Sequence, residues 1–262
     1  MNFAAAAGNA APTAIHTDSQ GLAQGDFKLP TANGSISAYY AAPEGRQDLP
    51  IVLVVQEIFG VHEHIKDVCR RFAKAGYLAV AANLYERQGD ASQYTDIPKL
   101  ISDLVAKVPD EQVYGDLDAS LAWAAEHGGN PARVGITGFC WGGRLTWMYA
   151  AHNPRVQAGV AWYGKLAAGH GPLIKQVALD IADKLHGPVL GLYGAKDESI
   201  PLADVEKMKQ RLAQGNEHSR ASEFVVYPDA GHAFYADYRP SYVKQAADDG
   251  WKRALEWFGR YV

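Results

Sequence analysis

The sequence predicts an α/β fold with a mostly parallel central sheet and helices on both of its faces. From about Gly25 onward, short β-branched apolar runs alternate with amphipathic stretches, a rhythm that is typical of repeated β-α-β units. The run from Pro50 to Gln56 (P-I-V-L-V-V-Q) is apolar at nearly every position, as expected for a strand covered on both faces. A chain of 262 residues can bury one substantial core, so a single domain is the simplest organisation.

Each expected element has a local reason. The dipeptide Asn33-Gly34 predicts a hairpin turn, and Gly76 predicts the end of a helix. The expected strands are 26–29, 35–41, 50–56, 77–82, 133–137, 158–163, 189–193 and 223–227. The expected helices are 64–75, 116–127, 144–151, 202–212 and 241–258. We assign residues 25–262 to one domain.

The segment 1–24 is expected to be a flexible N-terminal extension, since its first fourteen residues are Ala-rich and carry no charged side chain. It lacks the positive region of a complete secretory signal. Two interpretations are open: a tail of a cytoplasmic protein, which we favour slightly, or the remnant of a trimmed export signal of a periplasmic one.

Composition excludes several classes of protein. The formal net charge of −4 offers no basic surface for nucleic acid, and no segment has the apolar length that crosses a membrane. With Cys69 and Cys140 as the only cysteines, no disulfide framework is expected. The residues call for no cofactor, and His62-Glu63-His64 is interpreted as a polar loop rather than a metal site, because its two histidines do not share a helix face.

The strongest local motif is Gly138-Phe139-Cys140-Trp141-Gly142, between an expected strand and an expected helix. It matches the strained strand-to-helix turn of α/β-hydrolases, with Cys in the place of Ser. The small residues on either side allow strand and helix to pack closely, and the adjacent helix N-terminus favours a thiolate. Cys140 is therefore the expected nucleophile, the alternative being a buried structural cysteine.

Partners for this thiol follow in the chain order that the fold uses, which is nucleophile, acid and histidine. Asp197 and His232 each lie directly after an expected strand, at the sheet edge where α/β folds place their sites. Glu57 follows the first buried strand and reaches the same edge, either as a carboxylate beside the thiol or as a solvated loop acid. We expect the backbone N–H groups of Ile58 and Trp141 to stabilise an oxyanion.

The residues resemble the dienelactone hydrolases (carboxymethylenebutenolidases). Five segments carry the resemblance: V-V-Q-E-I-F-G-V at 54–61, N-L-Y-E-R-Q at 83–88, G-F-C-W-G-G at 138–143, G-A-K-D at 194–197 and A-G-H-A-F at 230–234. The resemblance implies a triad of Cys140, Asp197 and His232. It also implies that Glu57 holds the resting thiol and that Arg87 binds a substrate carboxylate.

The sequence departs from the family at one position, because Ala236 stands where the second carboxylate-binding arginine is found, with Arg239 nearby. This departure puts the acidic group of the substrate in doubt more than the hydrolysis. Aromatic side chains expected near the substrate are Tyr85, Phe59, Tyr163 and Phe234.

The expected function is hydrolysis of a small lactone or ester through a cysteine acyl-enzyme, by a monomer or small homo-oligomer. Two alternatives remain: a broad-specificity carboxylesterase or thioesterase for neutral esters, and a catalytically silent binding module.

Overall fold

A computed structural model describes residues 5–262 of the chain. Its strands are β1 (Leu22–Thr31), β2 (Gly34–Pro43), β3 (Leu49–Val55), β4 (Leu78–Ala82), β5 (Gly129–Phe139), β6 (Val156–Trp162), β7 (Val189–Gly194) and β8 (Glu223–Tyr227). Its α-helices are α1 (Glu63–Lys74), α2 (Ile97–Asp103), α3 (Asp110–Glu126), α4 (Trp141–His152), α5 (Ala178–Ile181), α6 (Leu202–Ala213), α7 (Glu217–Arg220) and α8 (Lys244–Tyr261). Short 3₁₀ turns occupy Ala5–Ala7, Ala91–Gln93 and Val105–Lys107.

Within the described residues the strands form one eight-stranded sheet in the order β1-β2-β4-β3-β5-β6-β7-β8. The β1–β2 hairpin is antiparallel and joins β4 antiparallel, whereas all pairs from β4 to β8 are parallel. Because parallel strands end at a common edge, the loops after β3, β5, β6, β7 and β8 meet on one side of the sheet.

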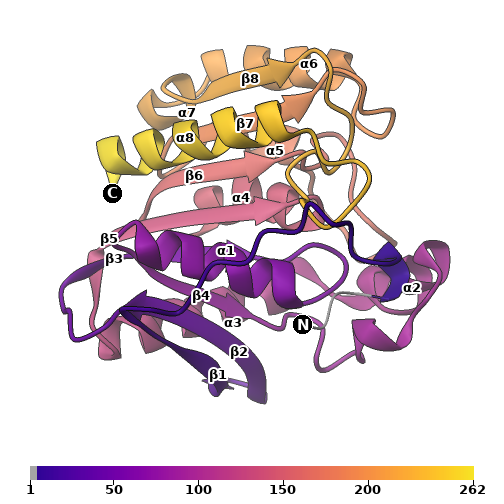
Figure 1. The fold of residues 1–262 in the computed structure, drawn as a ribbon. Coiled ribbons are helices and arrows are strands. Elements are labelled where there is room, and N and C mark those ends of the chain that lie inside the picture. The colour runs from indigo at the N-terminus through magenta and orange to yellow at the C-terminus, as the bar shows by residue number, and fades with distance from the viewer. Residues whose placement is uncertain (1–4) are drawn as a thin grey trace.

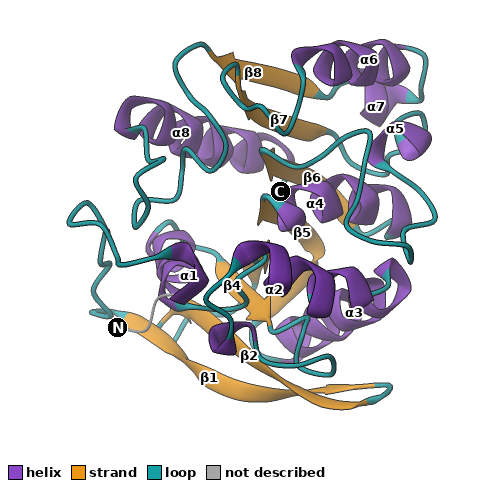
Figure 2. Cartoon of the chain, turned by 90° about the vertical axis from the view of Figure 1, so that its right-hand side faces the viewer, coloured by secondary structure: helices purple, strands orange, loops and turns teal. Residues whose placement is uncertain are grey.

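Helices cover both faces of this sheet. In Figure 1, α1 and α8 lie in front of the strands, and α3, α4 and α6 lie behind them. The view turned by 90° shows α2 as a separate element near α1 and α3 (Figure 2). The predicted class, a mostly parallel sheet between two helical layers, is therefore confirmed.

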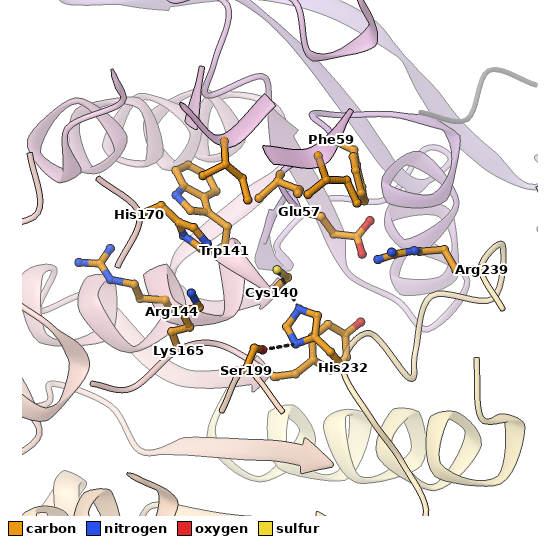
Figure 3. A pocket seen from close by; sticks show the side chains of 14 residues that line it. Glu57, Phe59, Cys140, Trp141, Arg144, Lys165, His170, Ser199, His232 and Arg239 are labelled. Atoms are coloured by element: carbon orange, nitrogen blue, oxygen red, sulfur yellow. Dashed lines mark hydrogen bonds between the residues drawn. The ribbon is translucent and has the colours of Figure 1, made fainter. Parts of the chain in front are cut away.

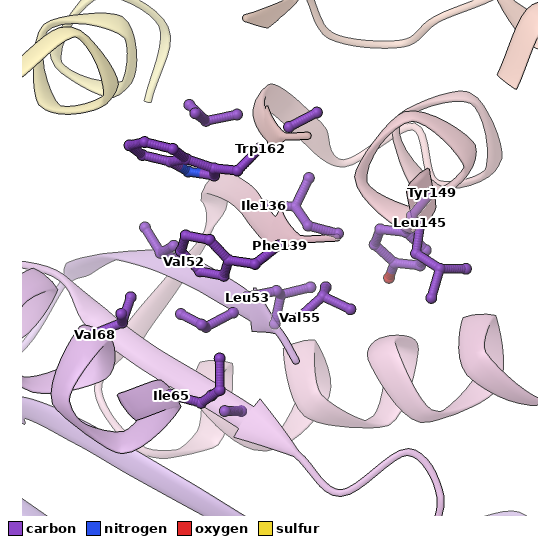
Figure 4. Packing of buried hydrophobic residues seen from close by; sticks show 14 of the residues in the cluster. Val52, Leu53, Val55, Ile65, Val68, Ile136, Phe139, Leu145, Tyr149 and Trp162 are labelled. Carbon is purple, nitrogen blue, oxygen red and sulfur yellow. The ribbon is translucent and has the colours of Figure 1, made fainter. Parts of the chain in front are cut away.

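The core lies where the central strands meet α1 and α4. Figure 4 shows Val52 and Phe139 of the strands near Ile65 and Val68 of α1, with Leu145 of α4 on the other side. Each of these side chains is at most 1% exposed. The apolar character of 50–56 follows from this burial, since helices cover β3 on both faces.

The predicted strands and the longer predicted helices are all present, with shifted ends. The third helix starts at Asp110 instead of Asp116, directly after Pro109. The helix α2 was missed, although Asp96 accepts a hydrogen bond from the Lys99 N–H and Pro98 stands in the first turn, both of which are helix-start signals.

The N-terminal boundary also shifts, because β1 begins at Leu22 and the proposed division between residues 24 and 25 falls inside this strand. Residues before β1 contact the rest of the fold. The Thr13 hydroxyl donates to the Asp237 carbonyl (2.6 Å), and the Thr17 N–H donates to the Asp67 carboxylate of α1 (2.6 Å).

Among residues 5–262, none of the helices combines the length and apolar character that crossing a bilayer demands.

A matched pair of glycines in α8 tests how tightly this helix packs. A Cβ at Gly250 would lie 2.7 Å from the buried Trp162 ring, whereas a Cβ at Gly259 would meet nothing within 4 Å. We expect Gly250→Ala to lower the free energy of unfolding by about 1–3 kcal/mol through overpacking. Gly259→Ala should raise it by about 0.5–1 kcal/mol through helix propensity. Urea unfolding measures both, and a gain in stability from Gly250→Ala would contradict the packing described.

Candidate active site

The turn between β5 and α4 holds Cys140 in a strained conformation. Its φ of 55° lies in the left-handed region that L-residues avoid. The turn is tight because α4 begins against the strands: a Cβ at Gly138 would lie 2.1 Å from the Gly142 carbonyl oxygen, and one at Gly142 would lie 2.4 Å from the Val55 carbonyl oxygen. Only glycine fits at both positions, which explains the spacing of the motif.

Cys140, His232 and Asp197 form a hydrogen-bonded row. The His232 Nε2 atom lies 3.1 Å from the Cys140 sulfur, and its Nδ1 atom lies 2.7 Å from the Asp197 carboxylate. The other Asp197 oxygen accepts from the backbone N–H (2.9 Å) and the hydroxyl (2.6 Å) of Ser199. The loops after β5, β7 and β8 thus bring together three residues that are far apart in the chain.

The row favours a charged imidazole. Burial disfavours the imidazolium, but the facing Cys140 sulfur and the Asp197 carboxylate stabilise it more and raise the pKa of His232 to about 10. The His232 loop is fixed from behind by Arg71 of α1, which donates to the Asp237 carboxylate and to the Tyr235 hydroxyl (3.1 Å). A fixed loop keeps the imidazole in line with the sulfur.

Glu57 lies near this row, but its carboxylate is hydrogen-bonded to other residues. Its Oε2 atom accepts from the Tyr238 hydroxyl (2.7 Å) and lies 3.1 Å from His62 Nε2. Burial would raise the pKa of this carboxyl, but His62, His64 and Tyr238 lower it to about 2. Within residues 5–262, the sulfur of Cys140 is hydrogen-bonded to His232 and not to Glu57.

The row opens into a pocket of about 230 Å³ (Figure 3). Of the residues predicted for the site, this pocket is lined by Glu57, Ile58, Phe59, Cys140, Trp141, Tyr163 and His232. Trp141 is the first residue of α4, and N–H groups in a first helical turn have no partner within the helix. This location suits the predicted oxyanion contact.

The profile described as "Dienelactone hydrolase family" matches residues 36–262. The chain belongs to the dienelactone hydrolase family. A Salmonella typhimurium protein named "Putative carboxymethylenebutenolidase" is 55% identical over 260 residues, which cover 99% of this chain and 95% of that protein. A Bradyrhizobium protein named "Probable 2-oxo-3-(5-oxofuran-2-ylidene)propanoate lactonase" is 32% identical over 222 residues, covering 83% of this chain and 86% of that one.

A solved structure supports the same assignment. The crystal structure titled a "Putative Dienelactone Hydrolase" from Klebsiella pneumoniae has a TM-score of 0.88 and 55% identity, and the match covers 92% of this chain and 99% of that one. The family identifies the protein as a carboxylic ester hydrolase with an α/β-hydrolase fold, so the predicted fold, family and enzyme class are confirmed.

Three of the predicted substrate contacts lie outside the pocket lining. Arg87 makes a two-point ion pair with Asp116 of α3, with both N–O distances at 2.8 Å. Its guanidinium is therefore already paired with a carboxylate of the protein. Tyr85 is fully buried and packs on Trp141, and Phe234 is fully buried against Tyr163. These aromatic residues support the pocket wall from behind.

The pocket also contains residues that the sequence interpretation did not assign. Ile97 and Ile101 of α2 form an apolar wall, and Arg144, Lys165, His170, Ser199 and Arg239 supply polar groups. The side chain of Ala236 is fully buried, whereas Arg239 reaches the lining and places its guanidinium 5.4 Å from the centre of the Phe59 ring. The sequence signals for α2 are the cap at Asp96 and Pro98 in its first turn.

Among the described residues, a cluster with the spacing of metal ligands consists of His16, Glu63 and Asp67. Arg70 donates to Glu63 (2.6 Å) and to Asp67 (3.0 Å). Because a guanidinium already neutralises these carboxylates, the cluster is better described as an ion-pair network of α1.

Replacing Asp197 tests whether its negative charge stabilises the His232 imidazolium. Asp197→Asn should lower the pKa of His232 toward the ordinary value of 6.5, because the imidazolium loses a negative neighbour. An NMR titration of the His232 ring protons measures this. Asp229→Asn is the matched control, since Asp229 is exposed and pairs with Lys196 (2.8 Å). Equal titration of His232 in wild type and Asp197→Asn would contradict the coupling.

Proposed function

We propose that this family member hydrolyses a small lactone or ester through a thioester intermediate on Cys140. The observation that carries the proposal is the Cys140–His232–Asp197 row, with contacts of 3.1 and 2.7 Å, at the wall of a pocket. A nucleophile, a base and an acid that orients the base are the parts that acyl transfer requires. The name of the Bradyrhizobium relative, a lactonase, supports a lactone as the substrate class.

In the first half of the reaction, His232 takes the thiol proton and the Cys140 sulfur attacks the substrate carbonyl carbon. The carbonyl oxygen becomes an oxyanion, which the N–H groups of Ile58 and Trp141 stabilise. When the carbon–oxygen bond of the ester breaks, His232 returns its proton to the leaving oxygen. A leaving enolate suits this step, because a poorer leaving group would let the sulfur depart instead.

In the second half, His232 takes a proton from water, and the resulting hydroxide attacks the thioester carbon. The carbon–sulfur bond then breaks, His232 returns the proton to the leaving Cys140 sulfur, and the product leaves as a carboxylic acid. Asp197 stabilises the imidazolium formed in both halves. The side chain of His232 is 31% exposed, so solvent water has access to the imidazole.

Glu57 acts in this proposal as a restraint on the thiol. An ionised carboxylate in the same pocket disfavours a second negative charge on Cys140. We therefore expect the thiolate to form more readily once a substrate separates the two groups.

Neutral esters are a second candidate substrate class. The apolar wall of Ile58, Phe59, Ile97, Ile101 and Trp141 favours them, since such side chains bind an uncharged acyl chain by burying it.

Replacing the nucleophile tests the central step. Cys140→Ala should reduce kcat/KM for an enol lactone or an aryl ester by at least about 1,000-fold, because no thioester can form. Cys69→Ala is the matched control, since Cys69 is buried in α1. Steady-state kinetics with each folded variant measures the effect, and a Cys140→Ala enzyme with the wild-type rate would refute the proposal.

A second substitution tests the restraint. Glu57→Gln should speed the alkylation of Cys140 by iodoacetamide at pH 7, because loss of the negative charge favours the thiolate. The amide oxygen of Gln still accepts from Tyr238, so the fold is retained. Mass spectrometry follows the modification with time, and an unchanged or slower rate would exclude this role for Glu57.

A further inference from the structure

Three nitrogen-bearing side chains line the pocket on one side of Cys140. Arg144 comes from α4, and Lys165 and His170 come from the segment between β6 and α5. Figure 3 shows these three residues together, on the side of Cys140 opposite to Glu57 and Arg239. We call them the Arg144–Lys165–His170 cluster.

Most of the N–H groups of Arg144 bind other protein groups, but one has no partner among the described residues. Its terminal nitrogens bind both Asp110 oxygens (2.9 and 2.7 Å) and the Gln176 carbonyl (2.7 Å). Its Nε atom is buried and has no hydrogen-bond partner among the described residues, and the same holds for His170 Nδ1. A buried polar group without a partner costs about 1–3 kcal/mol, so a ligand that accepts from both atoms would be favoured.

The cluster also carries an uncompensated positive charge. Asp110 neutralises Arg144, but Lys165 forms no ion pair with any residue of the described chain. His170 responds to this environment: burial, together with the charges of Lys165 and Arg144, lowers its pKa to about 4. The two cations would attract an anion, and the neutral imidazole adds no negative charge that would oppose its binding.

The opposite side of the pocket is electrostatically different. Arg239 lies on the same side as the Glu57 carboxylate in Figure 3. The hydrogen bonds from Tyr238 and His62 hold Glu57 ionised, so its negative charge offsets the guanidinium. An anionic ligand group is therefore favoured at Lys165 and disfavoured near Glu57.

We propose that the Arg144–Lys165–His170 cluster is a subsite that binds a carboxylate of the substrate while Cys140 attacks its ester bond. The two oxygens of a carboxylate accept about four hydrogen bonds, of which the Lys165 ammonium can supply up to three. The unpartnered Arg144 Nε and His170 Nδ1 atoms belong to side chains that line the same pocket. This inference rests on the proposed thioester function. It assigns the acidic group to residues other than Arg87, which pairs with Asp116.

Lys165 is the residue to test, because changing Arg144 would also break its pair with Asp110. The experiment compares the mono-4-nitrophenyl ester of glutaric acid with 4-nitrophenyl pentanoate, which has the same chain length and no carboxylate. Lys165→Met should lower the ratio of kcat/KM for the acidic ester to that for the neutral ester by about tenfold or more, as for loss of a charged hydrogen bond. Lys165→Arg should keep most of the preference.

Lys175→Met is the matched control on the same segment, because Lys175 is exposed and pairs with Glu111 (2.5 Å). It should leave the ratio unchanged. The subsite is refuted if Lys165→Met leaves the ratio unchanged, or if Arg239→Gln abolishes the preference and Lys165→Met does not.

A measurement that needs no turnover separates this inference from the proposed function. Glutarate should protect Cys140 from iodoacetamide in wild type and Lys165→Arg, and protect it about tenfold less well in Lys165→Met. Burial raises the pKa of the Cys69 thiol, so the modification reports on Cys140. Equal protection in all three proteins, or none in any, would overturn the subsite even if ester hydrolysis is absent.

Discussion

The close approach of α4 to the central strands is the constraint on which the site depends. It forces Cys140 to a φ of 55°, a conformation that costs about 1–3 kcal/mol and persists only where surrounding packing enforces it. A Cβ at Gly143 would lie 2.4 Å from the Trp162 carbonyl oxygen, so β6 contributes to the same constraint. The thiol, the start of α4 and the pocket wall are therefore positioned by one packing arrangement.

The charged side chains of the pocket lie on two sides of the Cys140 thiol. Glu57 is held ionised on one side by Tyr238 and His62. On the other side, Lys165 has no ion-pair partner among residues 5–262. His232 contacts the Cys140 sulfur and is stabilised as an imidazolium by that sulfur and by Asp197. In this arrangement a negative charge on sulfur is disfavoured by Glu57 and favoured by His232, and an acidic substrate is directed to the Lys165 side.

The parts of the site that the sequence could predict are those fixed by local geometry. The glycines around Cys140 exist because strand and helix must approach, and Asp197 and His232 follow strands whose ends share one edge of the sheet. Arg87 could not be placed correctly, because its partner Asp116 becomes a neighbour only through the packing of α3. Lys165 and His170 lie on a long connection without periodicity, where no sequence pattern indicates that two side chains face a pocket. The helix α2 carried its signal at Asp96 and Pro98, but its seven residues are too few to show a clear apolar period.

The most direct test of the account is to identify the atom that carries the acyl group. In His232→Gln the glutarate 4-nitrophenyl ester should still acylate the sulfur slowly, because 4-nitrophenolate leaves without needing a proton. Without an imidazole to activate water, the intermediate should then accumulate and be trapped by an acid quench. Peptide mass mapping should then place one added acyl group on Cys140, in the peptide that spans the β5–α4 turn. An acyl group on any other residue, or hydrolysis of the ester by this variant at the wild-type rate with Cys140 unmodified, would contradict the central claim.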